Sequence, residues 1–361
     1  MGATKSEAGS LRVGIVGAAG YTGAELLRLI HRHPKLRLTW VGAQSNAGKR
    51  LDSVLPSTLG VAGVGDLVLE AFDVADAPAL AQQLDVACCC LPHAQSAKVV
   101  ASLVAQGLQV VDLSADFRLR KPEDYAEWYG AHPAPELLDR AVYGLPELYR
   151  TELVGAQLIA APGCYPTSAI LPLAPLLRAG LLELAGPIIV DAKSGVTGAG
   201  KSPTSGTHFP ETGEGIRAYK VAGTHRHTGD IEQELSLAAG AQVSVVFTPH
   251  LVPMSRGILS VAYARPKAGV DVERCRAAAR EMYPSAGLVS VLDQQLPDTL
   301  WVRGSARAHV AYQLDPRTGM LLALGAIDNL TRGASGQALH ALNVARGWPE
   351  HLGLPELAQF P

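Results

Sequence analysis

The stretch Leu158–Thr167 (LIAAPGCYPT) carries a cysteine in a setting where a thiol could react. A short apolar run ends in Pro-Gly, Cys164 follows at once, and the next proline opens an apolar run to about Ala179. This order predicts a strand, a tight turn and a helix that begins beside the thiol, although Pro172 and Pro175 should kink or break that helix. The amides and dipole at a helix N-terminus favour an anion, so we expect a lowered pKa for Cys164 and a role as nucleophile. The alternative is a small buried hydrophobic residue.

A glycine-rich turn near the N-terminus has the composition of a phosphate-binding loop. Leu11–Gly17 is a short apolar run, Gly17–Gly23 (GAAGYTG) follows, and Glu25–Ile30 has helical spacing. Strand, glycine turn and helix form the context of a dinucleotide fingerprint, in which backbone amides approach a pyrophosphate. The spacing is G-x-x-G-x-x-G rather than the usual G-x-G-x-x-G, so an ordinary turn is the alternative. The expected cofactor contacts are Gly17, Ala18, Ala19, Gly20, Tyr21, Thr22 and Gly23.

The end of the predicted second strand, Leu36–Val41, indicates which dinucleotide binds. An NAD site usually places an acidic residue there, but this chain continues with GAQSN, and Lys49 and Arg50 lie beyond. A hydroxyl and two cations suit a 2′-phosphate, so we expect NADP(H), with Ser45, Lys49 and Arg50 near that phosphate. A solvated basic turn is the alternative.

Apolar runs predict further strands at 66–72, 85–91, 108–114 and 156–161, with a helix at 94–107 and an ordered loop at 121–150. Strands that alternate with helices indicate a parallel α/β sheet. Successive residues of a strand face opposite sides, so Cys88, Cys89 and Cys90 should be core residues and no metal site is expected. Pro92 and His93 follow that strand at the edge where cofactor loops lie, and we expect both to contact the cofactor.

The second half of the chain predicts a mixed, largely antiparallel sheet, with strand patterns at 187–194, 242–250, 257–265 and 306–324. A glycine-rich loop extends to about Gly223, an amphipathic helix starts near Thr228, and a final helix covers about 334–345.

Gly195–Ser202 (GVTGAGKS) matches the phosphate-binding motif of P-loop nucleotide hydrolases and follows a predicted strand. That motif requires a helix to start at its Lys-Ser. The next residues, 203–210, contain two prolines and a glycine, which exclude a regular helix. We therefore expect a flexible loop that closes over a substrate, with a P-loop hydrolase as a remote alternative.

Composition narrows the class of protein. The 361 residues are 48% hydrophobic, which allows a sizeable core and two domains, and the net charge of −2 argues against a nucleic-acid partner. No apolar run reaches the ~18 residues of a membrane span. Five cysteines, three of them adjacent, argue against a disulfide framework and favour the cytoplasm. Met1–Ser6 fits a myristoylation pattern, but one acyl chain anchors weakly, so no membrane partner is expected.

Five motifs occur in order over roughly 11–350, namely Gly17–Gly23, Ala161–Thr167 (APGCYPT), Ser194–Gly200 (SGVTGAG), His225–Thr228 (HRHT) and Ala326–Leu330 (AIDNL). Together they resemble the N-acetyl-gamma-glutamyl-phosphate reductases of arginine biosynthesis, relatives of aspartate-semialdehyde dehydrogenases. The resemblance implies an α/β fold with a Rossmann NADP-binding domain at 11–161 and 326–361, and we expect residues 1–10 to be a disordered tail. An α+β catalytic, substrate-binding and oligomerisation domain would cover 162–325.

The resemblance also implies the reaction. An NADPH-dependent enzyme of this kind reduces N-acetyl-gamma-glutamyl phosphate, a small acyl phosphate, to N-acetylglutamate 5-semialdehyde and phosphate through a cysteine thioester. Such enzymes are homotetramers or homodimers. The closest alternative is a carrier-protein-linked reductase of lysine biosynthesis, which shares most of the motifs. A non-catalytic dinucleotide sensor would not need Cys164 at such a turn.

Residue roles transfer motif by motif. Cys164 would be the nucleophile and His227 the general acid and base, with His225 nearer the substrate. The substrate pocket would comprise Arg118, Ser194, Tyr219, His225 and Asp230, and the nicotinamide would be approached by Gly195, Gly198 and Asn329. The chain departs from the family twice, with Ser45-Asn46 in place of a common Ser-Arg and Gly229-Asp230 in place of a common Pro-Glu.

Overall fold

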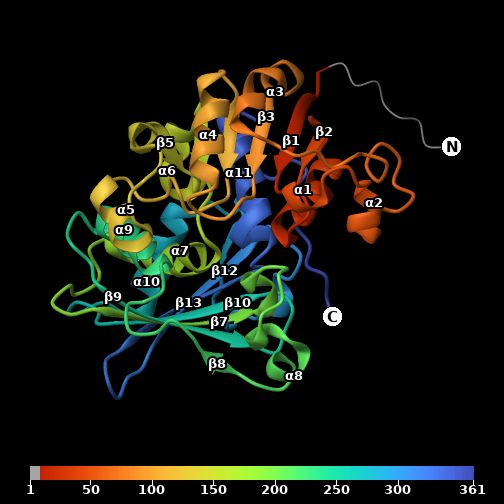
Figure 1. Cartoon of the computed structure of the whole chain (residues 1–361). Coiled ribbons are helices and arrows are strands. Elements are labelled where there is room, and N and C mark those ends of the chain that lie inside the picture. The colour runs from red at the N-terminus through yellow and green to blue at the C-terminus, as the bar shows by residue number, and fades with distance from the viewer. Residues whose placement is uncertain (1–8) are drawn as a thin grey trace.

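A parallel six-stranded sheet forms the upper part of the computed structural model, which describes residues 9–361 (Figure 1). Its strand order is β2-β1-β3-β4-β6-β5. The strands are β1 (Leu11–Val16), β2 (Leu36–Gly42), β3 (Val86–Cys89), β4 (Gln109–Asp112), β5 (Ala141–Tyr143) and β6 (Leu158–Ala160). All four residues of β3 and of β4 are buried, as expected for central strands covered on both faces.

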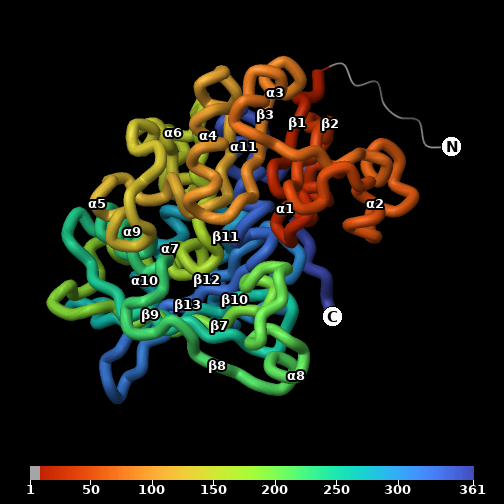
Figure 2. Tube along the Cα trace, viewed as in Figure 1, coloured from red at the N-terminus to blue at the C-terminus, as the bar shows by residue number. Residues whose placement is uncertain are grey.

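Helices pack on both faces of this sheet. One core contains α1 (Tyr21–Arg32) and α11 (Gly336–Ala345), and the other contains α3 (Ala77–Gln83) and α4 (Ser96–Ala105). The C-terminal helix α11 therefore completes the core of the N-terminal sheet, and Figure 2 shows this blue segment among the red and orange ones.

The second sheet has seven strands in the order β11-β12-β13-β10-β7-β9-β8. Four of its six neighbouring pairs are antiparallel, so the predicted mixed, largely antiparallel sheet is confirmed. The strands are β7 (Ile188–Gly195), β8 (Arg217–Ala218), β9 (Val245–Val252), β10 (Ile258–Ala264), β11 (Val289–Val291), β12 (Ala308–Leu314) and β13 (Leu321–Ile327).

Three helices cover one face of the second sheet and separate it from the first (Figure 1). They are α7 (Cys164–Arg178), α9 (His227–Ala239) and α10 (Val272–Met282). The burial of β7 alternates along the strand, with Ile188 and Val190 buried and Ile189 exposed on the other face. The second face of this sheet is therefore partly apolar.

Helix α7 continues through Pro172 and Pro175, so the two prolines do not break it. A helix proline leaves the carbonyl four residues earlier without its usual donor. For Pro175 that carbonyl belongs to Leu171, and the buried Tyr283 hydroxyl donates to it at 2.7 Å. The tertiary structure thus replaces the missing hydrogen bond.

Three local predictions are wrong. Residues 66–72 form isolated bridges rather than a strand. The segment 121–150, predicted as a loop, holds α5 (Pro122–Tyr129), a 3-10 helix (Pro135–Arg140), β5 and α6 (Pro146–Leu153), each helical element beginning with proline, which is favoured at a first helical position. The glycine-rich loop before Gly223 contains β8 and short helical turns.

The remaining elements are short. They are α2 (Leu51–Val54), α8 (Phe209–Thr212), a π-turn (Thr331–Ser335) and 3-10 turns at Gln44–Asn46, Pro56–Thr58, Val74–Asp76, Val196–Ala199, Ser205–Thr207 and Thr299–Trp301. Within residues 9–361, no helix has both the length and the apolar character to cross a bilayer. The predicted tail at 1–10 lies largely outside the described residues, and the acylation pattern at 1–6 lies wholly outside them.

Candidate active site

Cys164 is the first residue of α7, and β6 ends four residues before it. The predicted order of strand, tight turn and helix is therefore confirmed. Behind the cysteine lies the π-turn, where a Cβ on Gly333 would fall 2.6 Å from the Cβ of Cys164. Only glycine allows this close approach, so the C-terminal segment shapes the surroundings of the thiol.

His227 begins α9 and reaches the residue before the cysteine. A Cβ on Gly163 would lie 2.5 Å from Nε2 of His227 and 3.0 Å from Nη1 of Arg118. These two side chains are 3.4 Å apart, and because a guanidinium can only donate, Nε2 of the histidine faces Arg118 with its lone pair. The structure thus brings Cys164, His227 and Arg118 together around one glycine.

Arg118 is held by the protein on one edge. Its Nε donates to the Ala161 carbonyl at 2.8 Å, and its Nη2 donates to the Leu113 carbonyl at 3.0 Å. Its Nη1 lies 3.9 Å from Oδ2 of Asp230, whose other oxygen accepts a 2.6 Å hydrogen bond from Tyr143. The guanidinium is therefore a fixed positive charge beside the thiol.

Tyrosine and histidine rings form the next wall of the site. Tyr219 donates to the Tyr165 hydroxyl at 3.2 Å, and both rings meet His225 edge-on. The Nδ1 atom of His225 accepts from the backbone N–H of His227 at 3.1 Å. His225 thereby orients the residue that reaches Gly163.

A cavity of about 610 Å³ opens in front of these rings. It is lined by the predicted residues His93, Gly198, Tyr219, His225 and His227. Sequence reasoning missed the cationic side chains of the same cavity, which are Arg217, Lys220 and Arg226.

Arg226 connects the two sides of this cavity. Its guanidinium contacts the ring of His93 and stacks over Tyr129, with 5.1 Å between the guanidinium carbon and the ring centroid. The position of Arg226 between His225 and His227 was an available signal. Tyr129 gave none, because it lies in the segment predicted as a loop.

Burial dominates the protonation of the site. It raises the pKa of Cys164 to about 11, and the charge of Arg118 and the amides at the start of α7 offset this only in part. The expected lowered pKa of Cys164 is therefore wrong, because burial of the thiol outweighs its position at the start of α7. Burial also lowers the pKa of His227 well below its usual value, and that of His225 to about 4. Near neutral pH Cys164 is therefore a thiol and the imidazole of His227 is neutral.

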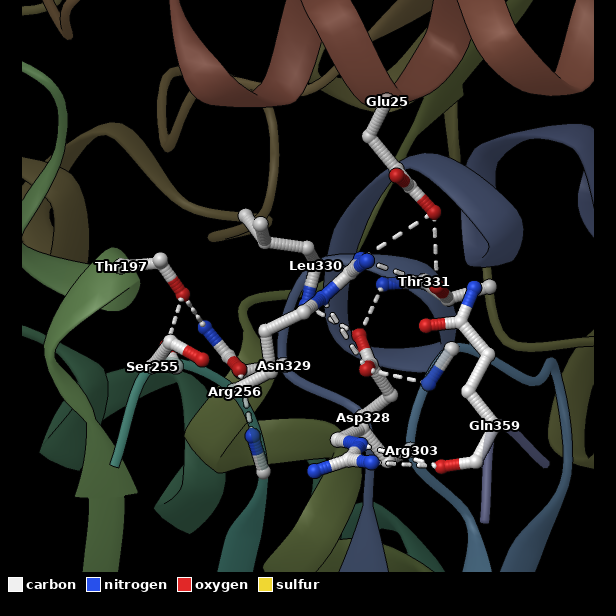
Figure 3. Close-up of polar contacts among 12 residues, drawn as sticks. Glu25, Thr197, Ser255, Arg256, Arg303, Asp328, Asn329, Leu330, Thr331 and Gln359 are labelled. Atoms are coloured by element: carbon white, nitrogen blue, oxygen red, sulfur yellow. Dashed lines mark hydrogen bonds and ion pairs between the residues drawn. The ribbon is translucent and has the colours of Figure 1, made fainter. Parts of the chain in front are cut away.

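The loop after β7 meets Asn329. A Cβ on Gly198 would lie 3.2 Å from Oγ of Ser194 and 3.7 Å from Nδ2 of Asn329. The same amide group donates to Thr197 at 2.9 Å (Figure 3). The structure thus brings together residues that were predicted from two separate motifs, namely Ser194, Gly195, Gly198 and Asn329. No helix starts at Lys201, so the P-loop interpretation lacks its required structure.

The glycine turn has the close backbone packing of a dinucleotide site. Gly17 has φ +90° and a Cβ there would lie 2.7 Å from the Cys90 carbonyl, while a Cβ on Gly23 would lie 2.6 Å from the Gly17 carbonyl. Gly20 caps α1 without a side-chain acceptor, which leaves the first amides of α1 for a ligand. A cavity of about 240 Å³ between Gly17, Gly42 and Leu91 adjoins the turn. These features fit a bound dinucleotide.

The expected 2′-phosphate contacts lie outside that cavity. Lys49 donates to Asn46 at 3.4 Å, and Asn46 donates to Ser45 at 3.3 Å. Arg50 pairs with Asp52 at 2.6 Å. Pro92 follows β3, and its carbonyl accepts hydrogen bonds from the backbone N–H groups of Gln95 and Ser96, where α4 begins. His93 lines the larger cavity instead.

Comparison with known proteins defines the family. Residues 12–156 match the semialdehyde dehydrogenase NAD binding domain, and residues 164–329 match the semialdehyde dehydrogenase dimerisation domain. Aspartate semialdehyde dehydrogenase II of Vibrio cholerae has the same fold, with a TM-score of 0.68 at 17% identity over 93% of this chain and 98% of that one. The Candida albicans aspartate semialdehyde dehydrogenase solved with NADP gives a TM-score of 0.67 at 17% identity, with the same coverage.

Curated relatives are much more similar in sequence. The chain is 48% identical over 354 residues to the N-acetyl-gamma-glutamyl-phosphate reductase of Magnetococcus marinus, covering 98% of this chain and 99% of that protein. It is 47% identical over 352 residues to the reductase of Geotalea daltonii, covering 97% of this chain and all of that protein. The geometry around Cys164 and this full-length identity lead to one conclusion: the chain belongs to the N-acetyl-gamma-glutamyl-phosphate reductase family.

Proposed function

We propose that this protein reduces N-acetyl-gamma-glutamyl phosphate to N-acetylglutamate 5-semialdehyde and phosphate with NADPH, in arginine biosynthesis. The observation that carries the proposal is the position of Cys164 at the first residue of α7, with Nε2 of His227 packed against the adjacent Gly163. The cationic lining of the larger cavity, Arg217, Lys220 and Arg226, suits a substrate that carries a carboxylate and an acyl phosphate.

The proposed covalent step starts from the thiol of Cys164 and the neutral imidazole of His227. The sulfur of Cys164 attacks the acyl carbon, its proton passes to Nε2 of His227, and the bond from that carbon to the phosphate oxygen breaks. A thioester on Cys164 results, and the phosphate leaves with a proton from the histidine. The charge of Arg118 stabilises the thiolate as it forms and disfavours a lasting imidazolium, in line with the lowered pKa of His227.

The second half-reaction regenerates the thiol. A bound NADPH would supply a hydride to the thioester carbon. The resulting oxyanion collapses to the aldehyde as the carbon–sulfur bond breaks, and Cys164 regains a proton that His227 takes up from solvent. Donors for the oxyanion are present near the cysteine in the N–H groups at the start of α7.

We also propose NADP(H) as the preferred cofactor, held at Gly17–Gly23, with Ser45, Lys49 and Arg50 toward the 2′-phosphate. The absence of an acidic residue after β2 supports this choice. Lys201 donates to the Ala19 carbonyl at 3.1 Å and adds a positive charge beside the turn.

The assignment of residues 11–161 and 326–361 to the cofactor domain, and of 162–325 to the catalytic domain, remains a proposal. The packing of α11 in the core of the first sheet supports it. We propose a homodimer or homotetramer assembled through the open face of the second sheet, where Ile189 and Val246 are exposed. A cytoplasmic location fits a reaction that needs Cys164 as a thiol.

The test is a phosphate-dependent NADP reduction assay run in the reverse direction. N-acetylglutamate 5-semialdehyde is compared with its one-carbon-longer homologue and with carrier-protein-linked semialdehydes. We expect turnover with the acetylated five-carbon substrate and strict dependence on phosphate. Preference for a carrier-linked substrate would instead assign the chain to the lysine-type reaction.

A further inference from the structure

Four charged side chains and one hydroxyl meet where α1 approaches the second sheet, and Figure 3 shows Glu25, Arg256, Asp328 and Thr331 of this group. We call them the Arg256 cluster, which comprises Glu25, Arg28, Arg256, Asp328 and Thr331. Two carboxylates and two guanidinium groups balance in charge. None of these residues has a functional role in the sequence-based predictions.

Arg256 joins three chain segments. Its Nη2 lies 3.1 Å from Glu25 on α1 and donates to Thr331 at 3.2 Å, and its Nε lies 3.1 Å from Asp328 at the end of β13. The side chain of Asp328 is fully buried and accepts hydrogen bonds from the amides of Gly304, Leu330 and Thr331. Its position is therefore fixed before Arg256 pairs with it.

The backbone around Arg256 supports the loop at 195–200. The Gly195 amide donates to the Gly257 carbonyl at 2.8 Å, and the Thr197 amide donates to the Ser255 carbonyl at 3.2 Å. A Cβ on Gly195 would lie 2.8 Å from the amide nitrogen of Arg256. The loop therefore lies directly on the turn that carries Arg256.

Asn329 ties the same parts together from the other side. Its Oδ1 accepts from the Gly257 amide at 2.8 Å, and its Nδ2 donates to Thr197 at 2.9 Å. The two residues after β13 therefore make different contacts. Asp328 pairs with the side chain of Arg256, and Asn329 pairs with the turn that carries Arg256 and with the loop at 195–200.

Glu25 connects this arrangement to the glycine turn. It lies on α1, five residues after the cap Gly20, and it receives Arg28 at 2.6 Å as well as Arg256. Burial would raise its pKa, but the hydrogen bonds from Arg28 and the charge of Arg256 lower the pKa below its usual value. Glu25 is therefore a charged anchor on the helix that begins at the proposed pyrophosphate site.

We propose that Arg256 is a positioning residue that fixes the loop at 195–200 relative to α1, so that the two ends of one dinucleotide meet surfaces held at a constant separation. The proposal rests on the proposed function, because it assumes that NADP(H) spans the glycine turn and this loop. Arginine suits the position because one planar guanidinium can pair with carboxylates on two sides. The residue itself contacts no reacting group.

The experiment compares two ligands that differ only at the nicotinamide. Binding of NADPH and of 2′-phospho-ADP-ribose, which is NADP without nicotinamide, is measured by calorimetry for wild type and Arg256→Met. We expect NADPH affinity to fall by about 10-fold while 2′-phospho-ADP-ribose affinity stays within about twofold, and kcat to fall by about 10- to 100-fold. Arg256→Lys should recover only part of either loss.

Arg303 provides a matched control. It lies beside the cluster in Figure 3, but its side chain donates to the carbonyls of Gln359 and Pro361 rather than to Glu25 or Asp328. Arg303→Met should leave both affinities and kcat unchanged. The variant Glu25→Gln should reproduce the selective loss of NADPH affinity, which tests the same link from the α1 side.

Three outcomes overturn the inference. Equal weakening of both ligands in Arg256→Met would indicate a general structural role. A change in the rate of Cys164 alkylation that equals the change in NADPH affinity would also indicate a general structural role. Unchanged NADPH affinity would show that the loop needs no such link. Failure of wild type to bind either ligand would refute the proposed cofactor itself, which separates the two proposals.

Discussion

The Arg256 cluster and helix α9, which begins in the candidate active site, both bury carboxyl groups, yet the pKa values of these groups shift in opposite directions. Glu25 meets two guanidinium groups and a hydroxyl, and its pKa is lowered despite burial. Asp230 and Glu234 are one turn apart on α9, and burial raises both pKa values, that of Glu234 to about 7. Each of the latter has a tyrosine hydroxyl as donor and only one arginine, at 3.9 Å.

The difference separates two uses of burial. Where opposite charges are in direct contact, a carboxylate stays ionised and holds elements together. Around Cys164 and along α9 burial outweighs the nearby charges, so the pKa values of the thiol, the imidazole and the two carboxyl groups shift toward the neutral forms. Near neutral pH the thiol of Cys164 and the imidazole of His227 are therefore both uncharged before substrate binds. The following predictions break or sharpen this comparison.

The largest effect is expected for Cys164→Ser. A hydroxyl is far harder to ionise than a thiol, so turnover should fall by several orders of magnitude, on the order of 10³-fold or more. NADP affinity should barely change, because the glycine turn lies on the other sheet. Intact-protein mass spectrometry after mixing wild type with acyl phosphate alone should show an adduct on Cys164. Near wild-type turnover in Cys164→Ser would refute the covalent mechanism.

His227→Asn should reduce kcat by about 100-fold, because the variant cannot accept the thiol proton. His225→Asn is the matched control from the same motif, and it should cost about 10-fold by loosening the start of α9. Steady-state kinetics with saturating NADPH provide both values. A larger loss in His225→Asn would exchange the assigned roles.

The alkylation rate of Cys164 tests the neutral pair directly. Since burial raises its pKa to about 11, the rate with iodoacetamide should increase about 10-fold per pH unit from pH 7 to 9 without reaching a plateau. Acyl phosphate should protect the thiol. A plateau near pH 7 would show that the thiolate is stabilised in solution more strongly than in this conformation.

Cofactor preference concerns the exposed end of the glycine-turn site. We expect at least ~10-fold preference for NADP over NAD, since one charged hydrogen bond contributes roughly 1.5–3 kcal/mol. Lys49→Ala and Arg50→Ala should raise KM for NADP and leave KM for NAD nearly unchanged. Because Arg50 already pairs with Asp52, its effect should be the smaller one. Equal efficiency with both cofactors would remove the basis of the assignment.

The sequence predicted the fold and the reactive turn because their signals are local. Periodicity located both sheets, and the residues around Cys164 determined a strand, a turn and a helix. The contents of 121–150 were missed because prolines that begin helices resemble loop signals. The pKa of Cys164 and the Arg256 cluster were not predictable, since they depend on burial and on pairs such as Glu25 and Arg256, 231 positions apart, that no local pattern reports.

The smallest effect is expected on stability, from Glu234. A carboxyl with a folded pKa of about 7 and an unfolded pKa near 4.5 holds more protons when folded. Stability should therefore decrease as pH rises from about 4.5 to about 7 and change no further above that. Glu234→Gln keeps an acceptor for Tyr149 and cannot ionise. The stability of this variant relative to wild type should therefore increase by about 1–2 kcal/mol as pH rises from 5 to 8.

Glu25→Gln is the matched variant for this stability measurement and should show the opposite sign. Its folded pKa is lowered, so the contribution of Glu25 is present above the unfolded pKa and is lost as pH falls. Glu25→Gln should therefore be more destabilising at pH 7 than at pH 4 in urea titrations followed by tryptophan fluorescence. If both variants respond to pH with the same sign, the contrast between paired and desolvated carboxyl groups is wrong. Opposite signs would show that the contacts of each carboxyl group, rather than burial alone, determine the direction of its pKa shift.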